Sequence, residues 1–171
     1  MVKDNFDLAI INHRPKKNSQ KMKLLCQGNI IFYCTQEYID QFGLPSTPQE
    51  LEDQLIIALM MDHEIQEKNT YLINRKTKQR TIFSPSYRIR QNSGYHDNQL
   101  AFSGPTIGIG MDIMLKHEIE AGTIMHLLSD YYLAGFDYYL LINPEGKNTR
   151  MQVFIDFINE CIERLELEKF N

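Results

Sequence analysis

The stretch QNSGYHDNQLAFSGPTIGIGMDIM, from Gln91 to Met114, contains the succession of signals that decides the fold. A strand is expected to end at Gln91, and the cap-like residues after it begin a helix from about Tyr95 to Ser103. A Gly104-Pro105 break ends that helix, and the short apolar run TIGIG, residues 106–110, predicts the next strand. This alternation favours an α/β architecture with a mainly parallel sheet.

Strand and helix signals continue to alternate on both sides of this stretch. The expected strands comprise residues 6–10, 29–35, 55–61, 70–74, 80–84, 86–91 and 137–142, and the other expected helices comprise residues 36–42, 48–54, 112–120 and 150–165. Thr35 and Gly43 suit the two ends of the first of these helices. Thr47, Pro48 and Glu50 form a capping box at the start of the second. The last helix places a set of apolar residues on one face, namely Met151, Phe154, Ile155, Ile158, Ile162 and Leu165.

The composition indicates a globular, acidic chain of one or two compact lobes. Its 171 residues are 43% hydrophobic and 23% charged, and the net charge of -4 gives no general attraction for a phosphate backbone. The longest apolar run, Leu55 to Met61, is far shorter than a membrane span, and the polar start MVKDNFD lacks a signal-peptide pattern. We therefore expect a cytoplasmic protein without membrane contact. Cys26, Cys34 and Cys161 suit reduced packing thiols.

Enzyme and metal motifs are missing from the sequence. It has no GxSxG elbow, Walker loop or GxGxxG turn, and the scattered histidines lack the spacing of a zinc site. The cluster Asp62-His63-Glu64 has no evident nucleophile beside it. We therefore expect that the protein is not an enzyme, and that it has no catalytic residue, no metal ligand and no cofactor. The basic run RKTKQ, residues 75–79, could contact phosphate, but in an acidic chain we favour a solvated hairpin tip.

The start of the helix after Gln91 is the first candidate ligand site. Asn92, Ser93 and Gly94 lie at this helix mouth, where backbone N–H groups attract anions, although both polar side chains could simply cap the helix. Gly108, Ile109 and Gly110 form a second candidate wall, because small residues permit close approach of a ligand or, alternatively, tight strand packing.

The chain resembles the effector-binding domain of LysR-type transcriptional regulators over essentially its whole length. FDLAI is similar to that family's DLAI strand, and IIFYCTQEYIDQFGLPSTPQEL to its crossing strand and the two helices after it. The stretch from Asn92 resembles the family's NNGEALRAAALAGLGIALLPDFL segment, and VFIDFINE its closing helix. Thr106 and Met111 depart from the family's usual glycine and proline, so the resemblance does not transfer ligand specificity.

The resemblance implies a periplasmic-binding-protein-like (type II) effector domain, with lobe two essentially complete and lobe one partial. Lobe two would comprise residues 27–143, and residues 1–26 and 144–171 would be remnants of lobe one. A small organic anion would bind in the interlobe cleft at the helix mouth and the glycine wall, with Asn12 and His13 after the first strand. A homo-oligomer is implied, and DNA would be bound only through a winged helix-turn-helix domain that this chain lacks.

Two further functions stay open at this point. A solute-binding protein shares the fold, but the expected cytoplasmic location favours the regulator. Alternatively, an incomplete lobe one could leave strand FDLAI and the last helix uncovered, and the chain would then act as an interaction module through protein–protein association.

Overall fold

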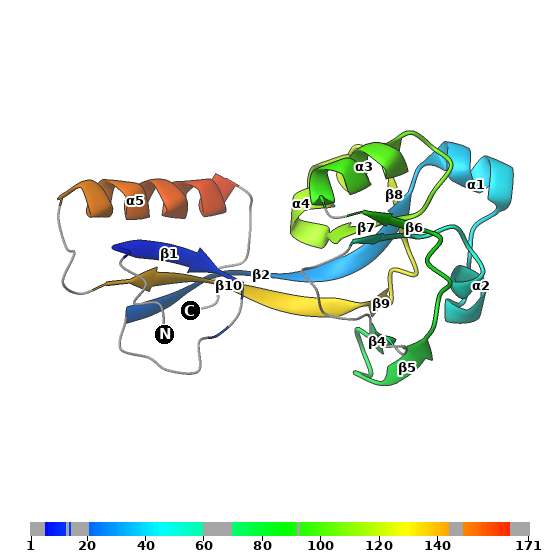
Figure 1. The fold of residues 1–171 in the computed structure, drawn as a ribbon, viewed down its shortest axis with the longest axis horizontal. Helices are drawn as coiled ribbons and strands as arrows, with labels where there is room; N and C mark the ends of the chain where they lie inside the picture. The colour runs from blue at the N-terminus through cyan, green and yellow to red at the C-terminus, as the bar shows by residue number, and fades with distance from the viewer. Residues whose placement is uncertain are drawn as a thin grey trace. The chain divides into compact units, whose positions relative to one another are not determined.

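The computed structural model describes residues 6–12, 14, 21–59, 70–91, 93–143 and 149–164. The chain divides into two compact units (Figure 1). Unit 1 combines Met1–Gly28 with Phe136–Asn171, and unit 2 is the continuous segment Asn29–Gly135. The chain passes between them within two long strands, β2 (Lys21–Cys34) and β10 (Ala134–Ile142).

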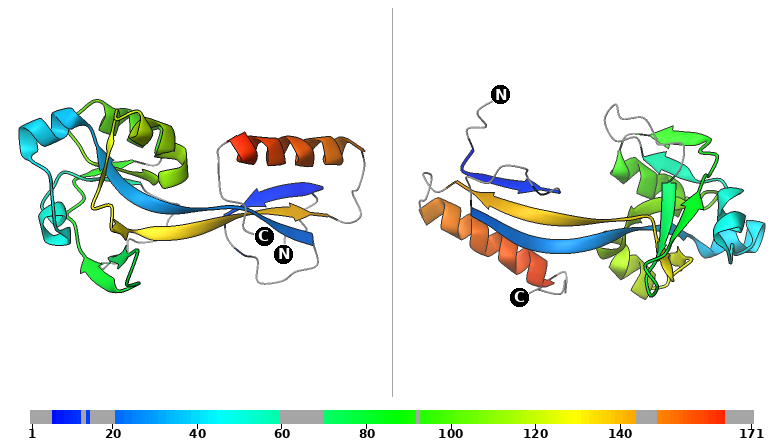
Figure 2. Two further views of the ribbon diagram at one scale, coloured as in Figure 1. Left: turned by 180° about the vertical axis from the view of Figure 1, so that it is seen from behind. Right: turned by 90° about the horizontal axis from the view of Figure 1, so that it is seen from below.

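Unit 1 is a small sheet with one helix on it. Strand β1 (Leu8–Ile11) pairs antiparallel with β10, and β10 is the neighbour of β2 in the order β1-β10-β2. Helix α5 (Thr149–Arg164) lies along one side of these strands (Figures 1 and 2). Leu25, Leu140 and Ile158 form the buried core between the sheet and the helix.

Unit 2 is built on the second half of β2, which pairs antiparallel with β7 (Gly108–Met111) and β8 (Met125–Leu127). Strands β3 (Ile57–Leu59) and β6 (Ile89–Gln91) pair in parallel, and Ile56 forms a parallel bridge with Ile107 just before β7. Helices α3 (Gly94–Phe102) and α4 (Asp112–Glu120) precede and follow β7. A smaller antiparallel sheet has the order β5 (Arg80–Phe83), β4 (Thr70–Asn74) and β9 (Tyr131–Tyr132).

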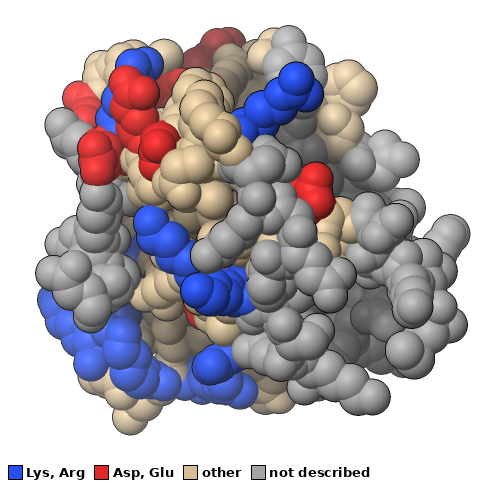
Figure 3. All heavy atoms as spheres, turned by 90° about the vertical axis from the view of Figure 1, so that its left-hand side faces the viewer, with Lys and Arg blue, Asp and Glu red and all other residues tan. Residues whose placement is uncertain are grey.

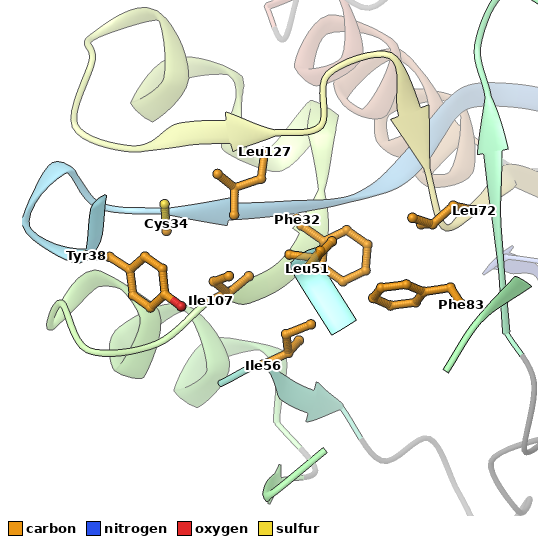
Figure 4. Packing of buried hydrophobic residues seen from close by; sticks show 9 residues of the cluster. All are labelled: Phe32, Cys34, Tyr38, Leu51, Ile56, Leu72, Phe83, Ile107 and Leu127. Atoms are coloured by element: carbon orange, nitrogen blue, oxygen red, sulfur yellow. The ribbon is translucent and has the colours of Figure 1, made fainter. Parts of the chain in front are cut away.

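The main core of unit 2 draws on elements that are far apart in the sequence. Phe32 of β2 contacts Phe83 of β5 edge to face, with ring centroids 5.3 Å apart. Side chains from α1, α2, β4 and β8 belong to the same buried cluster (Figure 4). The buried members of the cluster are Phe32, Cys34, Tyr38, Leu51, Ile56, Leu72, Phe83, Ile107 and Leu127. This core holds the hairpin β4–β5 and the β3–β6 pair to the same central strand.

The two predicted helix starts before residue 54 are confirmed. Thr35 caps α1 (Gln36–Phe42) by accepting a hydrogen bond from the N–H of Tyr38, and Gly43 with φ 85° ends the helix. Thr47 caps α2 (Pro48–Glu52) by accepting from the N–H of Glu50. The predicted capping box is modified, however, because the Glu50 carboxylate accepts from the N–H and hydroxyl of Ser46.

The expectation of a mainly parallel sheet is wrong for the described strands. Only the β3–β6 pair and the bridge beside it are parallel, whereas β1–β10, β2–β7, β2–β8, β4–β5 and β4–β9 are antiparallel. The sequence also failed to indicate β8 and β9, which have three and two residues and carry too little periodicity to be recognised. Strand β2 is longer than expected, because MKLLCQ and NIIFYC form one strand of 14 residues.

The final helix is present, but its predicted buried face needs one correction. Met151 and Ile158 are buried, and Ile155 and Ile162 pack against the core of unit 1. Phe154 is 47% exposed, because it lies on the flank of α5 rather than toward the sheet. Leu165 lies outside the described residues.

The compact units differ in extent from the lobes expected from the sequence. Unit 2 ends at Gly135, whereas lobe two was expected to reach Asn143. Residues of β10 from Phe136 onward belong to unit 1, where Tyr139 to Ile142 pair with β1. The assignment of the units to lobes of an effector domain stays a prediction.

Candidate functional site

The mouth of α3 lies in unit 2, at the carboxyl ends of two parallel strands. Leu59 and Gln91 are register partners at the ends of β3 and β6, and α3 begins shortly after Gln91. In open α/β sheets, ligands bind preferentially outside the carboxyl ends of parallel strands, where helix N-termini gather. The start of α3 therefore lies just beyond the ends of this parallel pair, and a ligand site there stays a prediction.

The first turn of α3 differs from those of α1 and α2 in how it is capped. Ser93 occupies the N-cap position with extended backbone, but its side chain makes no capping hydrogen bond. Gly94 to His96, the first three residues of the helix, include no acidic residue. Gly94, Tyr95 and His96 thus add no negative charge that would repel an anion at the positive end of the α3 dipole, and the first acidic residue of the helix is Asp97. Asn92 lies outside the described residues.

The position of α3 is held by a close contact with β2 and β7. The Tyr33 hydroxyl donates a hydrogen bond of 2.6 Å to Oδ1 of Asn98, which joins β2 to the middle of the helix. A Cβ on Gly108 would lie 2.5 Å from Cζ of Tyr33 and 2.7 Å from Cβ of Ala101. Gly108 is therefore needed for α3, β2 and β7 to approach one another.

The other two residues of the predicted glycine wall also have packing roles. A Cβ on Gly110 would lie 2.8 Å from Cδ1 of Leu115, the buried leucine of α4. Ile109 is partly buried and packs against the main core of unit 2. These contacts support the tight-packing alternative for the wall, and a ligand contact there stays a prediction.

A polar cluster that the sequence did not reveal lies at the start of α4. The Asp112 carboxylate accepts hydrogen bonds from the backbone N–H of Asn29 at 2.8 Å and from its Nδ2 at 2.9 Å. The same carboxylate accepts from the N–H of Ile113 at 2.9 Å and lies 3.7 Å from Arg75 Nη2. The start of α4 is thus occupied by a carboxylate of the chain itself.

Arg75 links this cluster to its surroundings. Its Nε donates to the carbonyl of Ser129, and its guanidinium carbon lies 5.5 Å from the ring centre of Tyr132. Burial lowers the pKa of His126, the nearby positive charge of Arg75 lowers it further, and the negative charge of Asp112 opposes both. We call Asn29, Arg75, Asp112, His126 and Tyr132 the Arg75 cluster. An acidic residue at the start of a predicted helix was its only sequence signal.

Two cations of the basic run at residues 75–79 are paired with carboxylates of the same chain. Arg75 belongs to the cluster just described, and Lys76 Nζ lies 3.4 Å from a carboxylate oxygen of Asp130. The Asn74 side chain accepts from the N–H groups of Lys76 and Thr77, which fixes the turn between β4 and β5. These contacts support the solvated hairpin tip rather than a phosphate site.

The remaining predicted site residues are only partly described. Asn12 is exposed in the bend after β1, and His13 lies outside the described residues, so their ligand role stays a prediction. Asp62-His63-Glu64 also lies outside them. Cys26, Cys34 and Cys161 are free, as expected, and burial raises the pKa of the Cys34 thiol to about 11. A thiol with so high a pKa is a poor nucleophile at neutral pH.

The described residues lack two further kinds of feature. Among them, no group of three His, Cys, Asp or Glu side chains is arranged to hold a metal ion. No helix in the described ranges combines the length and apolarity that a membrane span requires.

Comparison with known proteins finds likeness in structure alone. No family model matches the sequence, and no curated protein is significantly similar to it. The regulatory domain of AphB from Vibrio vulnificus superposes with a TM-score of 0.74 at 19% identity, covering 91% of this chain and 75% of that domain. The regulatory domain of CrgA, a LysR-type regulator from Neisseria meningitidis, gives 0.74 at 20% identity, with 91% and 75% covered.

More distant and longer structures agree with this result. The effector domain of AmpR from Pseudomonas aeruginosa gives a TM-score of 0.60 at 15% identity, with 92% of this chain and 71% of that domain covered. The chain spans 52% of full-length AphB from Vibrio cholerae. Likeness at such low identity establishes the fold. The chain therefore has the fold of the regulatory domains of LysR-type transcriptional regulators, which is the periplasmic-binding-protein-like α/β fold.

Proposed function

We propose that this chain is an effector-sensing domain of a LysR-type transcriptional regulator. The observation that carries the proposal is the superposition on the AphB and CrgA regulatory domains over 91% of the chain. The order of sequence motifs supports the same family, because FDLAI, TPQELED and VFIDFINE fall on β1, on the start of α2 and on α5. In this role the chain binds a ligand, and none of its residues carries out a catalytic step.

The proposed effector is a small organic anion, most simply a carboxylate, bound at the mouth of α3. Two features support this choice: residues 94–96 include no acidic residue, and α3 begins just after the ends of β3 and β6. The backbone N–H groups of the first turn would donate hydrogen bonds to the carboxylate oxygens, and Asn92 and Ser93 would orient the ligand without adding charge. The start of α4 is less suitable, because Asp112 would repel a second anion.

Carboxylate binding can be tested by chemical-shift mapping with acetate, benzoate and succinate. We expect the largest amide shifts at residues 93–96. The variant Gly94→Pro removes one N–H at the first helical position, where proline is compatible with the helix, and should weaken binding while the chain stays folded. Gln36→Pro makes the same change at the first position of the capped helix α1 and should bind like the wild type. Shifts that cluster elsewhere, or that persist in Gly94→Pro, would contradict the site.

The rest of the proposed role concerns the whole regulator. We propose that the domain works in the cytoplasm, as part of a homo-oligomer whose DNA contacts come from a separate winged helix-turn-helix domain. Full-length AphB, of which this chain spans 52%, has room for such a further domain. An upstream reading frame that encodes a helix-turn-helix in frame with Met1 would support this part of the proposal, and any other sequence there would count against it.

A further inference from the structure

The hairpin β4–β5 has one face in the core of unit 2 and one face toward solvent. Leu72 and Phe83 are fully buried on the inner face. Because side chains alternate along a strand, Tyr71 and Ile82 lie on the other face, where they are register partners. Tyr71 is 40% exposed and Ile82 is 56% exposed. The outer face of the hairpin therefore carries an exposed pair of apolar side chains.

The backbone of β5 also directs hydrogen-bonding groups away from β4. The N–H of Asn74 donates to the carbonyl of Gln79 at 2.9 Å, which makes these two residues a hydrogen-bonded pair. Such pairs recur at every second residue of an antiparallel ladder, so the N–H and C=O groups of Arg80 and Ile82 point away from β4. Strand β5 is the last strand in the order β5-β4-β9, so no described strand of this sheet lies on that side.

The two ends of this edge differ in charge. At one end, the N–H of Ser84 points away from β4 in the same phase and donates to Glu52 Oε1 of α2 at 2.8 Å. At the other end, Lys78 and Arg80 are exposed. The edge thus runs from a carboxylate of the chain to two cations, and this polarity gives a bound strand a preferred direction.

The cations of the hairpin are not balanced locally. Two of them are paired with carboxylates, as described above, but no carboxylate of the described residues forms an ion pair with Lys78 or Arg80. On the face shown in Figure 3, most Lys and Arg side chains gather in the lower half and most Asp and Glu side chains in the upper half. Residues 70–91 include no Asp or Glu and six cations, namely Arg75, Lys76, Lys78, Arg80, Arg88 and Arg90.

We propose that the outer edge and face of β5 bind an extended acidic segment of a partner protein, which adds as an antiparallel strand beside β5. The backbone of the added strand exchanges hydrogen bonds with Arg80 and Ile82. An apolar side chain of the segment packs on Tyr71 and Ile82. Because the strands are antiparallel, the side chain two residues later lies opposite Arg80, and an acidic residue there meets the guanidinium. A further acidic residue lies near Lys78.

A peptide fits these features better than the other possible occupants do. A strand edge offers N–H and C=O groups in alternation, and a peptide backbone carries the complementary pattern. A phosphate backbone would bring negative charge to the outward carbonyl oxygens of Arg80 and Ile82, and the net charge of -4 gives it no general attraction. A second copy of β5 would supply further cations instead of carboxylates.

Binding is tested by NMR titration of the full chain with the synthetic peptide acetyl-TVTETE-amide. We expect saturable amide shifts at residues 78–83. The peptide TVTKTK, with lysine in place of both glutamates, should bind at least about tenfold more weakly. N-methylation of the first glutamate removes the N–H that donates to the Arg80 carbonyl, and should weaken binding by a similar factor. This second peptide separates backbone pairing from attraction between charges.

A charge exchange in the protein adds a matched control. Arg80→Glu should lose binding of TVTETE and gain binding of TVTKTK, with an unchanged circular dichroism spectrum because Arg80 is exposed. Arg150→Glu makes the same change at an exposed cation of α5 and should bind TVTETE like the wild type.

The alternative occupants give different results. An oligonucleotide such as (dT)10 that shifts the same amides more strongly than TVTETE would overturn the proposal in favour of a nucleic acid. Light scattering that shows a dimer broken by Arg80→Glu would overturn it in favour of a second copy. The absence of saturable shifts at residues 78–83, or TVTETE binding that survives both N-methylation and Arg80→Glu, would also overturn it.

Discussion

His126 shows how a few charged neighbours set the behaviour of one residue. Burial and Arg75 lower its pKa, and Asp112 opposes them, so the folded protein favours the neutral ring. In the unfolded chain the histidine takes up a proton at about pH 6.5. Between that pH and the lower pKa of the folded state, the unfolded state binds more protons, and the free energy of unfolding therefore falls as the pH falls.

We predict that an NMR titration of the His126 ring gives a pKa below about 6.5. Arg75→Gln removes a positive neighbour and should raise the His126 pKa, whereas Asp112→Asn removes a negative neighbour and should lower it. Lys76→Gln, which removes a cation paired with Asp130 rather than Asp112, should leave the titration unchanged. Equal titration curves in all four proteins would contradict the assignment of these causes.

Gly108 controls the distance between α3 and the central strand. We predict that Gly108→Ala costs about 1–3 kcal/mol in the free energy of unfolding, because its Cβ would collide with Tyr33 and Ala101. Gly110→Ala should cost less, since its Cβ would meet the mobile end of Leu115. Urea denaturation of both variants measures the difference. A Gly108→Ala protein as stable as the wild type would mean that α3 can move away without penalty.

At the scale of the element, α5 separates a buried face from an exposed flank. We predict that Ile158→Ala lowers the free energy of unfolding by about 2–5 kcal/mol, because Ile158 is buried in the core of unit 1. Phe154→Ala should cost much less, since its ring is 47% exposed. Urea denaturation compares the two variants, and equal losses would show that the flank is covered within one chain.

The sequence predicted those elements whose signals are local. Helix α4 lies at the predicted residues, and the starts of α1 and α2 follow the threonine caps, because capping is decided within four residues. The helix-mouth site could be proposed for the same reason. The relative directions of the strands could not be predicted, because they depend on pairing between segments that are far apart in the sequence. Strand β2, for example, lies beside β10 and also pairs with β7 and β8.

The Arg75 cluster was missed for a related reason. Asn29, Arg75 and Asp112 come from β2, from the end of β4 and from the start of α4, and nothing near any one of them in the sequence indicates the other two. The exposure of Phe154 was missed because helical spacing alone placed it beside Ile155 and Ile158. The flank has an apolar residue where a simple amphipathic helix would have a polar one.

At the scale of the whole molecule, the charge balance decides which partners are plausible. The net charge is -4, and two cations of the β4–β5 tip are already paired with Asp112 and Asp130. We predict that the chain alone does not bind duplex DNA specifically, because specific recognition needs a positive surface and an element that reaches base edges. A gel shift against the operator of the parent regulator tests this, and a salt-sensitive specific complex would refute it.

The division of unit 1 into two chain segments has a consequence for folding. Gln27 and Asp137, which share a hydrogen bond in unit 1, are 110 residues apart, and Lys23 and Asn159 are 136 apart. Closing such long loops costs conformational entropy before any contact compensates it. Unit 2 is a continuous segment, so it can form as the ribosome releases it, and its formation brings Asn29 and Gly135 into one compact body. The early assembly of unit 2 thus shortens the effective loop, and β1 can complete its pairing only after β10 and α5 have been synthesised.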